Sequence, residues 1–304
     1  MDASFDVDRA PEPEDVRYGP AVLPDFWGAK RFVASNVSDG QKAVTLSGLR
    51  EMTPQIYLLS FTSPPDNRLT PAFLSTFRLA LDLILHSSQL ALKKGVLITT
   101  STIPKFYSNG LDFESAVADP DFFPQHLYPL WHRLLTFPMP TVALINGHAF
   151  AGGLMTTMMH DYRIMNPQKG FLCVNELEFG APLPPPMATI FKAKLPTPRS
   201  TLRTMVLEAR RFPAQDALKA GLIDGVGGLE ETVAFATQAK LVQKAQSPSY
   251  GLLKEELYKD VVADLTELAA QKASQEAKED LRQRSEEAAR RRVDEWAAST
   301  KAKL

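Results

Sequence analysis

The sequence is short of cysteine, of net charge and of uninterrupted apolar runs, and each shortage excludes a class of protein. A single cysteine, Cys173, rules out an internal disulfide bond and argues against a cysteine-rich metal site. We interpret it as a small buried residue. The formal net charge of −1 gives no electrostatic reason to expect a nucleic acid or an anionic membrane as a partner.

One stretch, from Leu134 to Met159, contains no Asp, Glu, Lys or Arg. Pro138, Pro140 and several glycines interrupt it, whereas a membrane-spanning helix needs about 20 continuous apolar residues. A buried strand followed by a buried helix fits this stretch better. The N-terminus is acidic and has no apolar run, so no secretory signal is visible.

The composition is that of a globular protein, with 44% hydrophobic and 23% charged residues in a chain of 304. Residues 1–50 are expected to form an N-terminal extension that is partly disordered, because Asp, Glu and Pro dominate its first 20 residues. Residues 51–250 should form the folded core. Residues 251–304 should form a helical C-terminal extension.

The central part alternates between strand-like and helix-like patterns. The predicted strands cover residues 55–61, 95–100, 141–145 and 171–174. The predicted helices cover residues 71–85, 123–135 and 152–160, and residues 198–225 should be helical with turns. This alternation indicates an α/β protein.

The last fifty residues favour a long helix. From Leu252 onward the chain is rich in Ala, Glu, Lys and Arg and contains no Gly or Pro. Its later half is almost all polar and has no sustained apolar heptad. A solvated or partner-contacting helix is therefore favoured over a coiled coil.

Two glycine-containing segments, residues 108–111 and 151–153, each follow a predicted strand. Each could present a free backbone N–H, because the first N–H groups of a helix have no partner within it. Two such groups that converge on one point make an oxyanion hole. Either segment alone is a weak signal, since tight turns without any chemistry use the same residues.

Around these segments the chain resembles the crotonase (enoyl-CoA hydratase/isomerase) superfamily, from about residue 55 to about residue 229. The matching phrases stand in the family's order and spacing: KFYSNGLDF, PMPTVALINGHAFAGG, MMHDYRIM, NELEFG and AQDALKAGLIDGV. Within the superfamily, the chain is most similar to the Δ3,Δ2-enoyl-CoA isomerases, particularly the plant peroxisomal type.

The resemblance implies a crotonase-like spiral of β-β-α units with a helical C-terminal region, assembled as a homotrimer or hexamer. It implies an acyl-CoA substrate, no separate cofactor and no metal. The oxyanion donors would be the N–H groups of Leu111 and Gly152. The substrate-binding positions that it implies are Arg68, Leu69, Ser108, Asn109, Gly110 and Met155. Arg68 and Leu69 would contact the adenine through their backbone, and an exposed loop charge is an equally good interpretation of Arg68.

The carboxylates decide which reaction the resemblance favours. Hydratases of this family use two glutamates to hold a water, and the corresponding positions here are Met155 and Glu176. With Met155 in the first place, the water would lose a partner. A lone carboxylate instead suits a proton transfer from C2 to C4 of a 3-enoyl thioester, with Glu176 as the acid/base group. Burial should raise its pKa toward the useful range.

Some alternatives remain open. Glu178 is the rival for the base, because on an extended segment it would share a face with Glu176. The motif match favours Glu176, and we interpret Glu178 as an acid at the surface or behind the site. His148, His160 and Asp161 are interpreted as buried structural residues, since no nucleophile elbow accompanies them. Asp112 is expected to brace its loop. The remaining histidines show no metal-ligand spacing: His86, His126 and His132.

The chain ends in Ala302-Lys303-Leu304, a close variant of the peroxisomal Ser-Lys-Leu address. The leading hypothesis is therefore a peroxisomal Δ3-Δ2-enoyl-CoA isomerase of fatty-acid β-oxidation, bound by the peroxisomal import receptor through this tripeptide. A second hypothesis is another crotonase-type reaction, either hydration or thioester hydrolysis, in secondary metabolism. A third is a non-catalytic acyl-CoA-binding protein.

Overall fold

The computed structural model describes residues 34–36, 44–88, 90, 92–195 and 199–301. Its main sheet has seven strands in the order β1-β2-β3-β4-β6-β8-β10. β1 to β3 pair antiparallel, and the pairs from β3 to β10 are parallel. The strands are β1 (Ala34–Asn36), β2 (Val44–Thr53), β3 (Ile56–Thr62), β4 (Val96–Ser101), β6 (Thr141–Ile145), β8 (Tyr162–Met165) and β10 (Gly225–Val226).

A second sheet has three short parallel strands in the order β5-β7-β9. They are β5 (Phe106–Ser108), β7 (His148–Phe150) and β9 (Leu172–Cys173). Each follows closely after a strand or turn that leads out of the main sheet. The small sheet therefore gathers the segments on which the candidate site residues stand.

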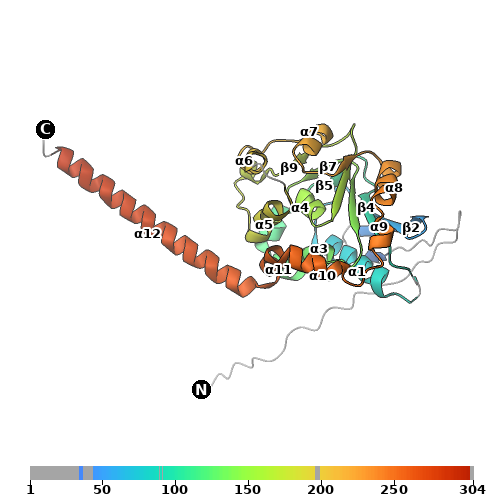
Figure 1. Ribbon diagram of the computed structural model, residues 1–304. Coiled ribbons are helices and arrows are strands. Elements are labelled where there is room, and N and C mark those ends of the chain that lie inside the picture. The colour runs from blue at the N-terminus through green and yellow to red at the C-terminus, as the bar shows by residue number, and fades with distance from the viewer. Residues whose placement is uncertain (1–33, 37–43, 89, 91, 196–198, 302–304) are drawn as a thin grey trace, which may run out of the picture.

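The main sheet is covered on both faces (Figure 1). In β3, Tyr57 and Leu59 contribute to the larger core, whereas Ile56 and Leu58 face the smaller core under α8 (Leu229–Gln238) and α9 (Leu241–Lys244). The larger core is packed by α1, α3, α4, α5 and α11. Strands that are buried on both faces explain the continuous apolar runs in the sequence.

The remaining elements lie as follows along the chain. They are α1 (Pro71–His86), α2 (Phe113–Ala118), a π-helical turn η1 (Phe122–Leu127), α3 (Tyr128–Leu135), α4 (Gly152–Met158), the 3-10 turn η2 (Glu176–Phe179), α5 (Pro185–Lys194), α6 (Arg199–Leu207), α7 (Ala214–Lys219), α10 (Tyr250–Leu257), α11 (Lys259–Thr266) and α12 (Leu268–Lys301). The four predicted strands and three predicted helices all correspond to observed elements.

Part of the local structure differs from the sequence prediction. The predicted loop 105–113 contains β5, and the predicted turn 146–148 runs into β7. β8 and α5 were not predicted as elements. Strands of two to four residues are too short to show a two-residue alternation, and α5 begins inside a proline-rich stretch.

Described parts of both expected extensions join the main structure. Of residues 1–50 these are 34–36 and 44–50, in β1 and β2, and the predicted partial disorder of the N-terminal extension falls on residues that the structure does not describe. The boundary placed at residue 51 falls inside β2. Beyond residue 250, α11 packs against α3 and α5 and buries Val261 and Leu265 in the larger core. Among the elements that the structure describes, α12 is the one that leaves the body of the protein (Figure 1). The predicted helical character of this region is observed.

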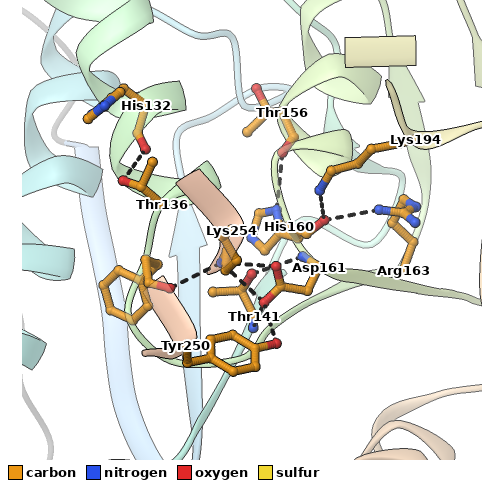
Figure 2. A network of polar contacts seen from close by, with 11 residues as sticks. His132, Thr136, Thr141, Thr156, His160, Asp161, Arg163, Lys194, Tyr250 and Lys254 are labelled. Atoms are coloured by element: carbon orange, nitrogen blue, oxygen red, sulfur yellow. Dashed lines mark hydrogen bonds and ion pairs between the residues drawn. The ribbon is translucent and has the colours of Figure 1, made fainter. Parts of the chain in front are cut away.

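A buried polar network fixes α10 to the sheet (Figure 2). Lys254 of α10 lies 2.9 Å from Asp161 and also donates to the carbonyl oxygen of Phe137. Asp161 accepts hydrogen bonds from the Tyr250 hydroxyl and from the Thr141 N–H. The expectation that Asp161 is a buried structural residue is therefore confirmed.

His148 and His160, which were also predicted to be buried structural residues, differ in their burial. His160 is fully buried and hydrogen-bonds through its ring to Thr99 and to the carbonyl of Thr156. Burial lowers its pKa to about 3, so its ring stays neutral. His148 is only half-buried, because it lies among exposed aromatic rings and accepts a hydrogen bond from the Phe171 N–H. The expectation of a buried His148 is corrected accordingly.

Candidate active site

A cleft of about 920 Å³ lies where the small sheet meets η2 and α5. Leu111, Ala151 and Glu176 all line it, although they are far apart in the sequence. Much of the remaining wall is apolar. The apolar wall residues are Phe113, Val117, Phe123, Phe179, Pro182, Pro184 and Met187.

The first wall of the cleft is the loop that leaves β5. Gly110 has a φ of +81°, a backbone conformation that glycine adopts without strain. Its N–H donates to the Ser108 hydroxyl, and its carbonyl accepts from the Leu69 N–H. The N–H of Leu111 has no hydrogen-bond partner among the described residues, so it is free to receive a ligand oxygen.

The second donor stands at the start of α4. Gly152 is the first residue of this helix, so its N–H has no acceptor within the helix. Ala151, just before it, has a φ of +49°, which is a strained conformation for a residue with a side chain. Strain of this kind is typical of functional turns, and here it sets the direction in which α4 begins.

The two donor segments touch each other. A Cβ placed on Gly110 would lie 3.3 Å from the nitrogen of Gly152, and one on Gly153 would collide with the carbonyl of Ser108. Glycine at these positions lets the two backbones approach this closely. The structure therefore brings the predicted donors Leu111 and Gly152 together: Leu111 and Ala151 line the cleft, and Gly152 is buried directly behind them.

Glu176 provides the acid/base group of the cleft. It is only 7% exposed, and one of its carboxyl oxygens has no hydrogen-bond partner among the residues that the structure describes. Burial raises the pKa of Glu176 to about 7. A carboxyl group with this pKa can take up and release a proton near neutral pH.

Glu178 does not share this environment. The segment is a 3-10 turn and not extended, so residues two apart point in different directions. The side chain of Glu178 is 49% exposed, lies 3.9 Å from Arg211 and does not line the cleft. The rival alternative, in which Glu178 shares a face with Glu176 on an extended segment, therefore does not hold, and the preferred interpretation of Glu178 as a surface acid agrees with its exposure.

The other predicted site residues fall into two groups. Arg68 and Asn109 line the cleft. Leu69, Ser108 and Met155 are buried behind its wall, with Met155 fully inaccessible on α4. Met155 therefore puts an apolar group, not an acid, into the core behind the second donor, and its predicted substrate contact has no counterpart in the lining of the cleft.

Sequence reasoning missed several residues that shape the site. Asn67, fully buried, donates to Ser101 and to the Tyr107 carbonyl, and thereby joins the loop after β3 to β4 and β5. Asp66 accepts from the side chain of Asn109 at 2.6 Å. The turn-forming sequence SPPDNR was the only available signal for this loop. Asp112 accepts from Ser115 at the start of α2, which agrees with its predicted bracing role.

Cys173 is buried as predicted and donates to the Ala209 carbonyl. Burial raises the pKa of its thiol to about 11. In the part of the chain that the structure describes, no group of three or more His, Cys, Asp or Glu residues could hold a metal ion. Across the same residues, no helix is both long and apolar enough to cross a membrane.

Comparison with protein families identifies this arrangement. Residues 51–295 match the family described as Enoyl-CoA hydratase/isomerase. The chain belongs to this family. The resemblance predicted from the sequence motifs is thereby confirmed, and an activity of the enoyl-CoA isomerase and hydratase type follows from it.

Named relatives are similar over most of the chain. Enoyl-CoA delta isomerase 1, peroxisomal, of Arabidopsis thaliana is 32% identical over 70% of this chain and 90% of its own length. Enoyl-CoA delta isomerase 3 of the same plant is 29% identical over 71% of this chain and 94% of its own. Rattus norvegicus enoyl-CoA delta isomerase 1, mitochondrial, is 30% identical over 56% of this chain and 59% of its own. These relatives support the prediction of an isomerase.

Solved structures confirm the predicted fold. An enoyl-CoA isomerase of Mycobacterium tuberculosis superposes with a TM-score of 0.60 and 24% identity, covering 72% of this chain and 93% of the other. Human mitochondrial delta3-delta2-enoyl-CoA isomerase superposes with a TM-score of 0.57 and 24% identity, covering 76% and 95%. The α/β crotonase-like fold with its helical C-terminal region is therefore shown.

Proposed function

We propose that the protein is a Δ3-Δ2-enoyl-CoA isomerase that uses Glu176 as its only proton carrier. The observation that carries this proposal is a buried carboxylate with an unpartnered oxygen, in the same cleft as two backbone segments with free N–H groups. No separate cofactor is needed for this chemistry, because the coenzyme A thioester itself acidifies the protons on C2.

The thioester oxygen is held by the N–H groups of Leu111 and Gly152. Glu176 removes a proton from C2 of a 3-enoyl-CoA, and the electrons move toward the thioester carbonyl. The resulting dienolate carries its negative charge on the oxygen, where the two N–H groups stabilise it. Loss of one such donor typically costs about 3 kcal/mol of transition-state stabilisation.

The second half of the reaction returns the same proton. The protonated Glu176 delivers it to C4, which gives the conjugated 2-enoyl-CoA and restores the carboxylate. The pKa of about 7 suits both directions, because the group must be a base in the first step and an acid in the second.

Isomerisation is favoured over hydration by the surroundings of Glu176. Hydration needs a second group to hold the attacking water, and α4 offers the buried Met155 in that region. The other carboxylates that line the cleft are Asp66, Asp112 and Glu114. Asp66 is tied to Asn109 and Arg68, and the side chains of Asp112 and Glu114 are exposed at the rim.

The reaction type can be tested on the wild-type protein with two substrates. Incubation with a 3-enoyl-CoA should produce the conjugated 2-enoyl-CoA, measured by its ultraviolet absorbance. Incubation with a 2-enoyl-CoA should give only slow water addition, measured by loss of the same absorbance. Rapid hydration with no isomerisation would assign the protein to the hydratases, and binding of both without turnover would make it a binding protein.

The cellular setting and assembly are also proposals. The similar enoyl-CoA delta isomerase 1 of Arabidopsis thaliana is called peroxisomal, and this chain carries the terminal sequence Ala302-Lys303-Leu304. These three residues lie outside the described residues. We place the enzyme in the peroxisome, in β-oxidation of fatty acids, recognised by the import receptor and assembled as a homotrimer or hexamer.

A further inference from the structure

The loop that presents Leu111 is held along its length by the residues after β3. The Asn109 N–H donates to the Asp66 carbonyl at 3.0 Å, and the Leu69 N–H donates to the Gly110 carbonyl at 2.9 Å. The Asp66 carboxylate accepts from the Asn109 side chain at 2.6 Å. Residues 66–69 and 109–111 therefore form a paired unit, although about 40 residues separate them in the chain.

One of these bonds determines where the Leu111 N–H points. In a trans peptide the carbonyl oxygen and the N–H point in opposite directions. The carbonyl of Gly110 and the N–H of Leu111 belong to the same peptide. Because the carbonyl is bound by Leu69, the N–H is directed away from residues 66–69.

Arg68 fixes the next peptide. Its Nη1 donates to the Leu111 carbonyl at 2.7 Å, and its Nε lies 3.2 Å from the Asp66 carboxylate. With the peptides on both sides of Leu111 restrained, neither of its backbone angles is free to change. A bond from a charged donor to a carbonyl is also stronger than one between neutral groups.

The charge of Arg68 is already balanced in the free protein. Asp66 is 15% exposed and pairs with the guanidinium, so the pair as a whole presents no net charge to a ligand. One oxygen of Asp66 is buried and has no hydrogen-bond partner in the described part of the chain, which adds negative potential beside the arginine. This environment is poorly suited to attracting the phosphate groups of coenzyme A.

We propose that Arg68 is a positioning residue for the isomerase reaction, which holds the Leu111 peptide so that its N–H can receive the thioester oxygen, and that it is not an anchor for coenzyme A phosphates. The contact that the family resemblance implied for Arg68 is one of its backbone to the adenine, so the proposal concerns a different part of the residue, the guanidinium. The inference rests on the proposed isomerase function.

The test compares kcat and KM of the wild type with those of Arg68→Met and Arg68→Lys, with a 3-enoyl-CoA as substrate. Arg68→Met keeps the apolar stem but removes every donor, so kcat should fall about 10–100-fold while KM changes less than about threefold. The kcat of Arg68→Lys should lie between that of the wild type and that of Arg68→Met. The affinity for free coenzyme A, measured by calorimetry, should be the same in all three.

A second readout separates positioning from general damage to the fold. The Arg68 side chain is 43% exposed and borders an open cleft, so a small guanidinium ion can reach its place. Millimolar guanidinium should restore part of the lost kcat in Arg68→Gly and leave the wild type unchanged. The matched control is Arg210→Met, because Arg210 has a similar exposure of 50% and a similar ion pair with Asp216 outside the cleft.

The possible outcomes are distinct. A raised KM with unchanged kcat, together with weaker coenzyme A binding, would show that Arg68 binds the phosphates and would overturn the inference. Unchanged kcat and KM would overturn it as well. If Arg68→Met does not fold, Asp66→Asn serves instead, because it weakens the support of the guanidinium and should lower kcat by a smaller factor. Absence of isomerase activity in the wild type would instead refute the proposed function.

Discussion

At the scale of single residues, the burial of Glu176 sets the pH range of the proposed reaction. Its raised pKa of about 7 means that the carboxyl is protonated in mildly acidic solution and cannot act as a base there. We expect kcat/KM for a 3-enoyl-CoA to rise with pH and to level off above a midpoint near 7. A midpoint near 4.5, the value of an ordinary glutamate, would show that the group is well solvated.

The same pKa predicts a cost in stability. Between pH 4.5 and about 7, the folded protein keeps a proton that the unfolded chain has released, so its free energy of unfolding falls as the pH rises through this interval. Glu176→Gln removes the ionisable carboxyl group and with it this pH-dependent loss of stability. The variant should therefore be more stable than the wild type at pH 8, by about 1–3 kcal/mol, and no more stable at pH 4.5.

Urea unfolding at the two pH values measures this difference. Glu178→Gln is the matched control, because its exposed side chain should change stability by less than about 0.5 kcal/mol at either pH. An equal gain for Glu176→Gln at both pH values would mean that better packing, and not the ionised carboxylate, explains the effect.

The residues of the site were predictable to different degrees. Glu176, Leu111 and Gly152 stand inside motifs that occupy short, continuous stretches of sequence, so family resemblance could locate them. Asp66, Arg68 and Leu69 support Leu111 through contacts between segments that are distant in the sequence. No local sequence pattern indicates such contacts.

At the scale of elements, the site depends on the close approach of the loop after β5 to the beginning of α4. Gly153→Ala would place a Cβ against the carbonyl of Ser108 and force the two segments apart. The N–H groups of Leu111 and Gly152 would then no longer converge on one point. We therefore expect kcat to fall at least about 100-fold, comparable to the loss of one donor. Steady-state kinetics measure this loss.

Gly228→Ala is the control for that substitution, since a Cβ there would meet only the Glu231 carboxylate, at 3.5 Å. It should retain wild-type kinetics. Full activity in Gly153→Ala would contradict the view that the spacing of these two segments determines the rate.

The anchoring of α10 gives a prediction about stability. Lys254→Met would leave the buried carboxylate of Asp161 without its cation, and removing one partner of a buried ion pair costs about 3–5 kcal/mol. Urea unfolding should show a loss of this size. Lys259→Met removes an exposed pair with Glu256 on the adjacent helix and should cost less than about 1 kcal/mol. Equal losses in the two variants would contradict the anchoring role.

Elements with a clear periodic or apolar pattern were predictable from the sequence. α1 shows a regular apolar stripe and a proline in its first turn, and β4 is a continuous apolar run. β8 and η2 have four residues each, so neither is long enough to display a period. Length alone did not decide the outcome, because the ten-residue β2 was not predicted either.

At the scale of the whole molecule, the body of the protein and α12 differ in how they are packed. The body is held by two apolar cores on the faces of one sheet, whereas most of α12 is solvent-exposed and follows α11 away from it (Figure 1). A polar helix with no apolar heptad was predictable from composition. The packing of α10 and α11 into the body was not, because it depends on a few buried side chains, among them Val261 and Leu265.

The central claim for the whole enzyme is that a single carboxylate, Glu176, carries the proton. Its most direct test is the rate of conversion of a 3-enoyl-CoA to the conjugated product by the wild type, Glu176→Gln and Glu178→Gln in one assay. The wild type and Glu178→Gln should turn over at similar rates, and Glu176→Gln should be slower by a factor on the order of 10²–10⁴. Wild-type turnover by Glu176→Gln would contradict the account.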